Sequence, residues 1–384
     1  MAKGCYVGVD VVARKVKRGY VGVSGVARRI KRAYIGVGGV ARPCWSSDPV
    51  SYYGAITPLS VARYRLACAS NGDYAIFAGG MQTGYQVKTT VDAYNQSLVR
   101  TIATQLSYEV YNLAGTSVGN YVIFGGGNNY SSSSDVDNQM TAYDKSLTKM
   151  KTQTLGYARD QLGGAFVGGY GLFAGGRDKY NGRTNYVDAY DASLTRTDPT
   201  ELRMSVSRPL CCSGHHAIFA GGYTDSSSPE GKTNYTTSYD SSLTRDHVGY
   251  LDKYTQDGAG AVAGDYLILA GGYGGSSSSA SDPLANTYAY NSSLTKVSIE
   301  PLSVARYSLG GASIGGCAIF AGGYKSGGYS SDVDVYDASL THTTGMYIGQ
   351  ALSDLVGTSV GNYAIFSGGL NSTAKDDAYA FTVA

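Results

Sequence analysis

The sequence predicts an all-β protein made of repeated four-stranded units, with a strand-rich arm of shorter period before them. Three observations support this prediction: a glycine-pair segment recurs seven times, the chain holds 53 Gly and 35 Tyr, and basic residues gather in the first 45 positions. Charged residues make up 16% of the chain and apolar residues 43%. A charged fraction below the usual value of about 25%, beside an ordinary apolar fraction, indicates a folded chain rather than a disordered one.

The first repeat is an apolar segment that ends in two glycines, as in YAIFAGG, YVIFGGG and YLILAGG. A glycine pair permits positive φ and close backbone approach, so each segment is expected to be a strand that ends at a turn. A second signature follows each copy, as in VDAYNQSL, and six copies place Leu four residues after the key Tyr. The last glycines of the seven pairs lie 46 to 51 residues apart: Gly80, Gly127, Gly176, Gly222, Gly272, Gly323 and Gly369.

Each repeat is expected to form four short strands, a to d. Strand a precedes a glycine turn, strand b is the apolar segment, strand c is the VDAY segment, and strand d follows an Asp/Asn-x-Ser turn. Short strands at this spacing, with a period near 50 residues, fit the blades of a β-propeller. The pattern resembles the kelch-repeat propellers, whose blades carry a diglycine after strand b and an aromatic residue in strand c. The resemblance covers about 330 of the 384 residues, although the Trp of kelch blades is replaced here by Thr in SLT.

Closure of the ring is predicted from the last repeat, which ends just after its strand c and therefore lacks strand d. The segment YYGAITPLSVARY before the first repeat matches VSIEPLSVARY, which contains the strand d of the sixth repeat. Residues 51–57 are therefore expected to be the outer strand of the last blade, which removes an exposed sheet edge. The predicted organisation is an arm at 1–45, a linker at 46–50, and a seven-bladed kelch-like propeller at 51–384.

The arm contains three similar units, YVGVDVVARKVKR, YVGVSGVARRIKR and YIGVGGVARPCW, with a 14-residue period. Val and Ile alternate with small or charged residues around a turn, which predicts strand, turn and strand in each unit. The arm holds ten Lys or Arg and one Asp, a charge of +9, so the other 339 residues carry −7 of the total of +2. We expect it to attach to partners or to copies of itself; the alternative is a solvated basic tail that orders only in a complex. The candidate attachment residues are Tyr6, Arg14, Tyr20, Arg28, Tyr34 and Arg42.

These arm units resemble repeats that precede a globular domain in structural proteins of prophages from Gram-positive gut bacteria. The resemblance implies a virion component, most simply at the tail, that is assembled in the host cytoplasm with other virion proteins. No run of apolar residues approaches the length of about 18 that spans a membrane, so no membrane partner is expected.

The long connections between strands b and c are expected to share one face of the ring. They are rich in Tyr, Ser, Gly and Asn, a composition that suits recognition because Tyr offers a large amphipathic contact and the small residues adapt their hydrogen bonds. The alternative is that these loops are only soluble connectors. The candidate contacts, for which a host-surface glycan is the expected ligand, are Tyr85, Tyr130, Tyr180, Tyr223, Tyr273, Tyr324 and Tyr329.

Catalysis, a cofactor and a metal are not expected, because the chain lacks the HExxH, GxSxG and Walker patterns and holds only four His. Asp188 and Asp191 could bind calcium, but such residues more often close a turn through hydrogen bonds to the backbone. A tyrosine-based copper site is a further alternative that sequence alone leaves open. The +9 arm could neutralise phosphates, but the regular strand-like spacing favours a structural role over nucleic-acid binding.

The leading hypothesis is therefore a non-enzymatic bacteriophage virion protein whose arm anchors to the particle and whose propeller displays loops for host-surface or glycan binding. The first alternative is a purely structural decoration protein of a capsid or tail. The second is a carbohydrate-active propeller enzyme.

Overall fold

The computed structural model describes residues 6–9, 12–15, 19–23, 26–30, 32–37, 40–46, 49–129, 136–225, 231–278 and 281–383, with side chains from residue 49 onward. All helix or strand elements in this part of the chain are β-strands. None of it forms a helix long and apolar enough to cross a membrane. The prediction of an all-β fold is confirmed.

Seven four-stranded antiparallel sheets occupy the described residues from Val50 onward. Sheets 1 to 3 contain β8 (Ala67–Ser70), β9 (Tyr74–Ala78), β10 (Val91–Asn95) and β11 (Arg100–Ile102); β12 (Ala114–Val118), β13 (Tyr121–Gly125), β14 (Met140–Tyr143) and β15 (Lys149–Met150); and β16 (Gly163–Val167), β17 (Tyr170–Ala174), β18 (Val187–Tyr190) and β19 (Arg196–Thr197).

The remaining four sheets follow the same order of strands. Sheets 4 and 5 contain β20 (Leu210–Ser213), β21 (Ala217–Ala220), β24 (Tyr235–Tyr239) and β25 (Arg245–Tyr250); and β27 (Ala259–Ala263), β28 (Tyr266–Ala270), β31 (Thr287–Tyr290) and β32 (Lys296–Val297). Sheets 6 and 7 contain β33 (Gly310–Ile314), β34 (Cys317–Ala321), β37 (Asp332–Tyr336) and β38 (His342–Tyr347); and β39 (Val356–Val360), β40 (Tyr363–Ser367), β43 (Ala378–Val383) and β7 (Val50–Ala55).

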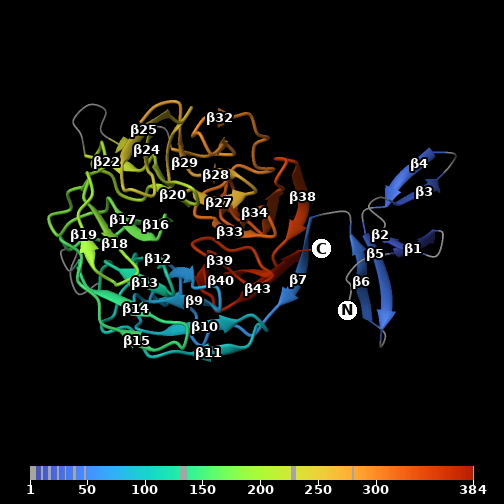
Figure 1. The fold of residues 1–384 in the computed structure, drawn as a ribbon, viewed down its shortest axis with the longest axis horizontal. Coiled ribbons are helices and arrows are strands. Elements are labelled where there is room, and N and C mark those ends of the chain that lie inside the picture. The colour runs from blue at the N-terminus through green and yellow to red at the C-terminus, as the bar shows by residue number, and fades with distance from the viewer. Residues whose placement is uncertain are drawn as a thin grey trace.

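The sheets surround a common centre, with their first strands innermost (Figure 1). Each first strand contacts the first strand of the next sheet, and β39 of sheet 7 contacts β8 of sheet 1. The ring of contacts is therefore closed, as in folds of the β-propeller type.

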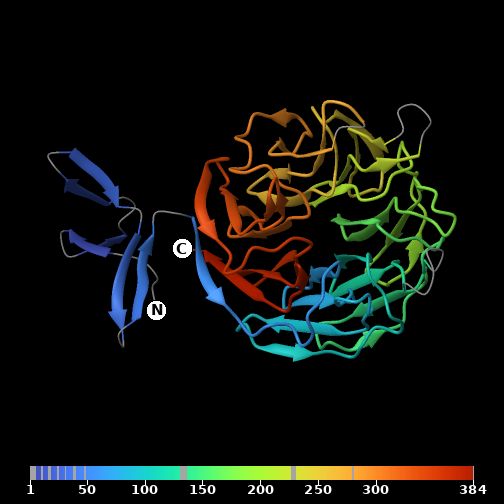
Figure 2. The same cartoon turned by 180° about the vertical axis from the view of Figure 1, so that it is seen from behind.

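The last sheet is completed by a strand from the other end of the described ring. β7 pairs antiparallel with β43, with Val50 beside Val383 and Ala55 beside Tyr379, and a register shift falls between Ala380 and Phe381. Figure 2 shows this blue strand against the red C-terminal sheet. The strand spans residues 50–55, whereas the sequence placed it at 51–57. It covers the outer edge of β43, an edge that would otherwise expose unpaired backbone groups.

The glycine pairs end strand b of every sheet, and their role is clear at Gly79 and Gly80. Both have positive φ, of 65° and 98°. A Cβ on Gly79 would lie 2.7 Å from the carbonyl oxygen of Val110, in the connection that leads into sheet 2, and one on Gly80 would lie 2.9 Å from that of Tyr64. The pair is therefore required because the connections that enter sheets 1 and 2 both approach it closely.

The repeated tyrosine of strand c is a packing residue between sheets. Tyr94 is fully buried, and its ring meets Phe77 edge to face at 5.7 Å. Its hydroxyl donates to the carbonyl oxygen of Thr57, which lies after the outer strand of sheet 7, at 2.8 Å. The side chain therefore ties one sheet to the preceding one.

The leucine four residues later occupies an unusual backbone conformation. Leu98 has a φ of 61°, and the five equivalent leucines have φ between 58° and 62°. Asn95 shapes this turn, because its Oδ1 accepts hydrogen bonds from the backbone N–H groups of Ser97 and Val99. A left-handed non-glycine residue is costly, and the burial of Leu98 in a cluster with Tyr94 offsets that cost.

The N-terminal residues pair as three antiparallel hairpins, one for each 14-residue unit. These are β1 (Tyr6–Val9) with β2 (Val12–Lys15), β3 (Gly19–Val23) with β4 (Val26–Ile30), and β5 (Arg32–Val37) with β6 (Val40–Ser46). Each candidate attachment residue lies in one of these strands, in chain order Tyr6, Arg14, Tyr20, Arg28, Tyr34 and Arg42. Their side chains lie outside the described part of the structure.

Short strands mark several of the long connections between strands b and c. They pair as β22 (Tyr223–Thr224) with β23 (Gly231–Lys232), β29 (Tyr273–Gly275) with β30 (Asp282–Pro283), β35 (Tyr324–Lys325) with β36 (Gly328–Tyr329), and β41 (Leu370–Asn371) with β42 (Thr373–Ala374). β29 also pairs with β26 (Tyr254–Gln256), which lies in the connection that leads into strand a of sheet 5. These pairings give the loop face a partly regular backbone.

Candidate functional site

The loop tyrosines that the sequence singled out do not form one continuous surface. Tyr85 and Tyr180 are exposed, at 60% and 81% of their surface. Tyr180 has the Lys179 ammonium 5.0 Å from its ring centre, and Tyr223 has the Arg183 guanidinium 4.7 Å from its own. Tyr130 lies outside the described residues.

Three of the predicted tyrosines are brought together by one that the prediction missed. The Tyr307 ring lies 4.8 Å from Tyr273 and 5.6 Å from Tyr324, and Tyr324 lies 5.2 Å from Tyr329. Tyr307 comes from the connection that enters sheet 6, not from a strand b to strand c loop. It pairs through its backbone with Tyr324. The four rings form a chain of aromatic contacts across sheets 5 and 6.

A ring of seven residues, one from each sheet, lies directly before strand a and surrounds the centre on the same face. All seven have left-handed backbone conformations, with φ between 52° and 57°. The residues of this ring, called the mouth ring below, are Arg65, Asn112, Gln161, Arg208, Asp257, Ser308 and Asp354. Sequence reasoning overlooked them because their side chains differ, although each occupies the same place in its repeat.

Backbone hydrogen bonds join the members of the mouth ring. Six of them donate the backbone N–H to the carbonyl oxygen of the preceding member, from Asn112 onto Arg65 at 3.1 Å round to Asp354 onto Ser308 at 3.0 Å. The remaining junction, between Asp354 and Arg65, is spanned by an ion pair at 3.9 Å. In the left-handed conformation, the backbone of each ring residue bonds to the ring residue of a neighbouring sheet. These bonds fix the positions of the Cα atoms from which the side chains project.

The mouth ring encloses a cavity of about 400 Å³. All seven ring residues line it, together with Tyr307, Tyr324 and Tyr329. A cavity of this size, with one aromatic wall and several fixed polar groups, has the character of a small-ligand site.

The charges of the cavity are arranged in two pairs. Arg208 donates from Nε to the Gln161 side-chain oxygen at 2.9 Å, and one of its terminal nitrogens lies 3.3 Å from an Asp257 carboxylate oxygen. Burial raises the pKa of Asp257 above its ordinary value; Arg208 opposes this and the charge of Asp354 adds to it. Burial also raises the pKa of Tyr307, with smaller contributions from neighbouring tyrosines and from both carboxylates. Asp257, Asp354 and Tyr307 therefore act on one another electrostatically.

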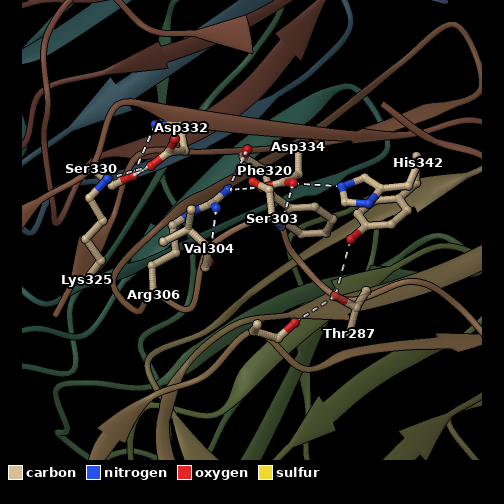
Figure 3. Close-up of polar contacts among 12 residues, drawn as sticks. Thr287, Ser303, Val304, Arg306, Phe320, Lys325, Ser330, Asp332, Asp334 and His342 are labelled. Atoms are coloured by element: carbon tan, nitrogen blue, oxygen red, sulfur yellow. Dashed lines mark hydrogen bonds and ion pairs between the residues drawn. The ribbon is translucent and has the colours of Figure 1, made fainter. Parts of the chain in front are cut away.

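A second group of polar residues is structural. Asp334 lies between Arg306 at 2.6 Å and His342 at 2.7 Å, and it accepts a hydrogen bond from the Ser303 N–H (Figure 3). Arg306 and Asp334 are buried, and the His342 ring stacks on Tyr336 with centres 4.5 Å apart. These side chains are engaged chiefly with one another below the surface, so we assign them a structural role.

The two acidic residues considered for calcium have different partners. Asp191 closes a turn, since its Oδ1 accepts from the backbone N–H groups of Ser193 and Thr195. Asp188 does not share this role, because it is buried and paired with Arg159 and Arg196. In the part of the chain that the structure describes, no group of three or more His, Cys, Asp or Glu is placed to hold a metal ion.

The comparisons with known proteins concern the fold. No family model matches the chain. No curated protein matches it either. A solved structure titled "Structure of YjhT" is similar, with a TM-score of 0.59 and 12% sequence identity over 76% of this chain and 99% of that one. At this identity the similarity supports a shared β-propeller type of fold and carries no information on ligands or activity.

Proposed function

We propose that the chain is a seven-bladed, kelch-like propeller of a bacteriophage virion, whose arm attaches it to the particle and whose mouth cavity binds a glycan of the host surface. The observation that carries the proposal is the cavity of about 400 Å³, with its tyrosine wall and seven conformationally fixed polar residues. Sugars are bound by such combinations, because aromatic faces cover their apolar C–H surfaces and polar side chains satisfy their hydroxyls.

The point at which the arm joins the ring supports attachment on one face of the ring and ligand binding on the opposite face. The cavity lies where the chain enters strand a and leaves strand b. Val50, the first residue of β7, pairs with Val383 at the far end of strand c, which is the opposite face of sheet 7. The chain therefore passes from the arm into the ring on the face away from the cavity. An arm bound to a particle there leaves the cavity open to the outside.

The composition of the arm supports attachment. Its three hairpins are too small to enclose a core of their own, and residues 1–45 together carry +9 against −7 on the rest of the chain. Other virion proteins and further copies of the chain are the proposed partners.

The test compares the full chain with a variant that lacks residues 1–45. The full chain should bind host cells and assemble, whereas the truncated protein should remain a folded monomer that fails to assemble, as measured by circular dichroism and light scattering. Residues 50–55 stay in the variant, so the ring keeps its outer strand. Failure of the full, assembled protein to bind host cells or cell-wall glycans would favour the purely structural decoration role. A truncated protein that still assembles would refute the role of the arm.

A further inference from the structure

The mouth ring is chemically polarised. Three consecutive members, Asp257, Ser308 and Asp354, present oxygen atoms, and they belong to sheets 5, 6 and 7. The members from sheets 1 to 4 include two arginines and two amides, Arg65, Asn112, Gln161 and Arg208. A ligand in the cavity therefore meets a side rich in acceptors and a side rich in donors.

The tyrosine wall lies on the acceptor side. Tyr307 immediately precedes Ser308, the middle member of the acceptor side, and it lines the cavity together with Tyr324 and Tyr329. The two ring members on either side of Ser308 are carboxylates, Asp257 before it and Asp354 after it. Aromatic faces and carboxylates both attract a positive charge, the first through the ring quadrupole and the second directly.

The two arginines engage the carboxylates of this side only at 3.3 and 3.9 Å, and the Ser353 hydroxyl also donates to Asp354 at 2.9 Å. The Arg208 guanidinium donates hydrogen bonds to both the Gln161 side-chain oxygen and the Asp257 carboxylate. Arg65 reaches Asp354 only at 3.9 Å, and its side chain is 42% exposed. Burial raises the pKa of Asp257 and the charge of Asp354 adds to the effect, while Arg208 and Arg65 oppose it without cancelling it, so ionisation of this carboxyl is penalised in the free protein. A cation placed between the two carboxylates would remove part of that penalty.

We propose that the mouth cavity selects glycans that carry a free primary amine, with the ammonium group held by Asp257, Asp354 and the Tyr307 face. The hydroxyls of the same sugar are directed to Asn112, across the ring from Asp257 and Ser308, and to Arg65, which lies beside Asp354. The N-acetylated form of the sugar lacks the charge, and it leaves both carboxylates without a cationic ligand group. This inference rests on the proposed glycan-binding function and names the class of glycan.

The test is calorimetric titration of the full chain with glucosamine oligosaccharides and with N-acetylglucosamine oligosaccharides of equal length. The amine form should bind about tenfold more tightly, since one charged contact of this kind accounts for that ratio. D354N should reduce the ratio to near one while weak binding of the acetylated form persists. D198N is the matched control, because Asp198 is an exposed acid outside the cavity, and it should leave the ratio unchanged.

Tyr307→Leu gives a second, independent variant, because it keeps an apolar side chain and both carboxylates but removes the aromatic face. It should weaken binding of the amine form more than that of the acetylated form, and a urea unfolding curve checks that the ring is intact. Equal binding of the two oligosaccharides by the full chain would overturn the amine proposal and leave glycan binding standing. If neither sugar binds while host cells are still bound, the amine proposal fails alone; if host cells are not bound either, the proposed function fails with it.

Discussion

Sheets 1, 3 and 6 differ from sheets 2, 4, 5 and 7 at two matched positions. The first position lies two residues before the mouth-ring residue of each sheet. The second lies on strand c, paired with the Phe or Leu of strand b. Sheets 1, 3 and 6 hold buried ion pairs there, namely Arg63 with Asp92, Arg159 with Asp188 and Arg306 with Asp334. The other four sheets hold Val110 and Thr141, Val206 and Thr237, Thr255 and Tyr288, and Leu352 and Tyr379.

The residues at these two positions change together. In the described sheets, an arginine at the first position always occurs with an aspartate at the second, and neither occurs alone. A lone buried charge is very costly, whereas a pair and an uncharged combination are both acceptable. The pair is also imperfect, because Nε of Arg63, Arg159 and Arg306 has no hydrogen-bond partner. The ion pairs therefore specify local geometry more than they add stability.

The largest expected effect comes from breaking one pair. Asp92→Thr should destabilise the protein by about 3–5 kcal/mol, because it leaves the fully buried Arg63 guanidinium without its carboxylate. Urea unfolding followed by circular dichroism measures the loss.

The matched control restores the uncharged combination of sheets 2 and 4. Adding Arg63→Val to Asp92→Thr should recover about half of the loss or more, since no unpaired charge remains buried. A double variant as unstable as the single one would show that the two positions are independent, which contradicts the comparison.

A smaller effect is expected at the glycine pair, which both classes of sheet share. Gly79→Ala should cost about 2–4 kcal/mol, because a left-handed alanine is strained and its Cβ would meet the Val110 carbonyl oxygen at 2.7 Å. Gly84→Ala is the control, with a φ of 82° and no heavy atom within 4 Å of the added Cβ. It should cost only the backbone strain, about 1 kcal/mol. Equal losses in the two variants would contradict the close approach between sheets.

The smallest effect is a difference in acid stability. Burial alone would raise the pKa of Asp334, but the hydrogen bond from His342 and the charge of Arg306 lower it below its ordinary value. The resulting stabilisation is complete above the unfolded-state pKa of about 3.9 and is lost as the pH falls through the lower folded-state pKa. The double variant Arg306→Leu with Asp334→Tyr, which copies sheet 7, should therefore lose less stability between pH 5 and pH 2 than the natural protein. Urea midpoints that fall in parallel for the two proteins would contradict this expectation.

Much of the fold could be predicted because its determinants are local. Gly79 and Gly80 recur as a pair in every repeat, and the segment around Tyr94 recurs as the predicted strand c. The outer strand of sheet 7 could be predicted because YYGAITPLSVARY matches VSIEPLSVARY. Its limits at Val50 and Ala55 could not, because they depend on where pairing with β43 ends.

The candidate site was predicted only in part. Tyr273, Tyr324 and Tyr329 were chosen from the composition of their loops, but Tyr307, which joins the first two, lies in a segment that looks like any other entry to strand a. Tyr85 and Tyr180 share the same loop composition and stand apart from the cavity lining.

The repeat, the strand order and the separation of charge between the arm and the ring follow from the amino-acid sequence alone, because turns, alternation and net charge are properties of short segments of the chain. Which side chains meet depends on how the sheets pack around the ring. The mouth ring unites seven different residues that lie far apart in sequence, and the backbone hydrogen bonds between sheets place them around one cavity. Such convergence depends on closing the ring, which no single repeat encodes.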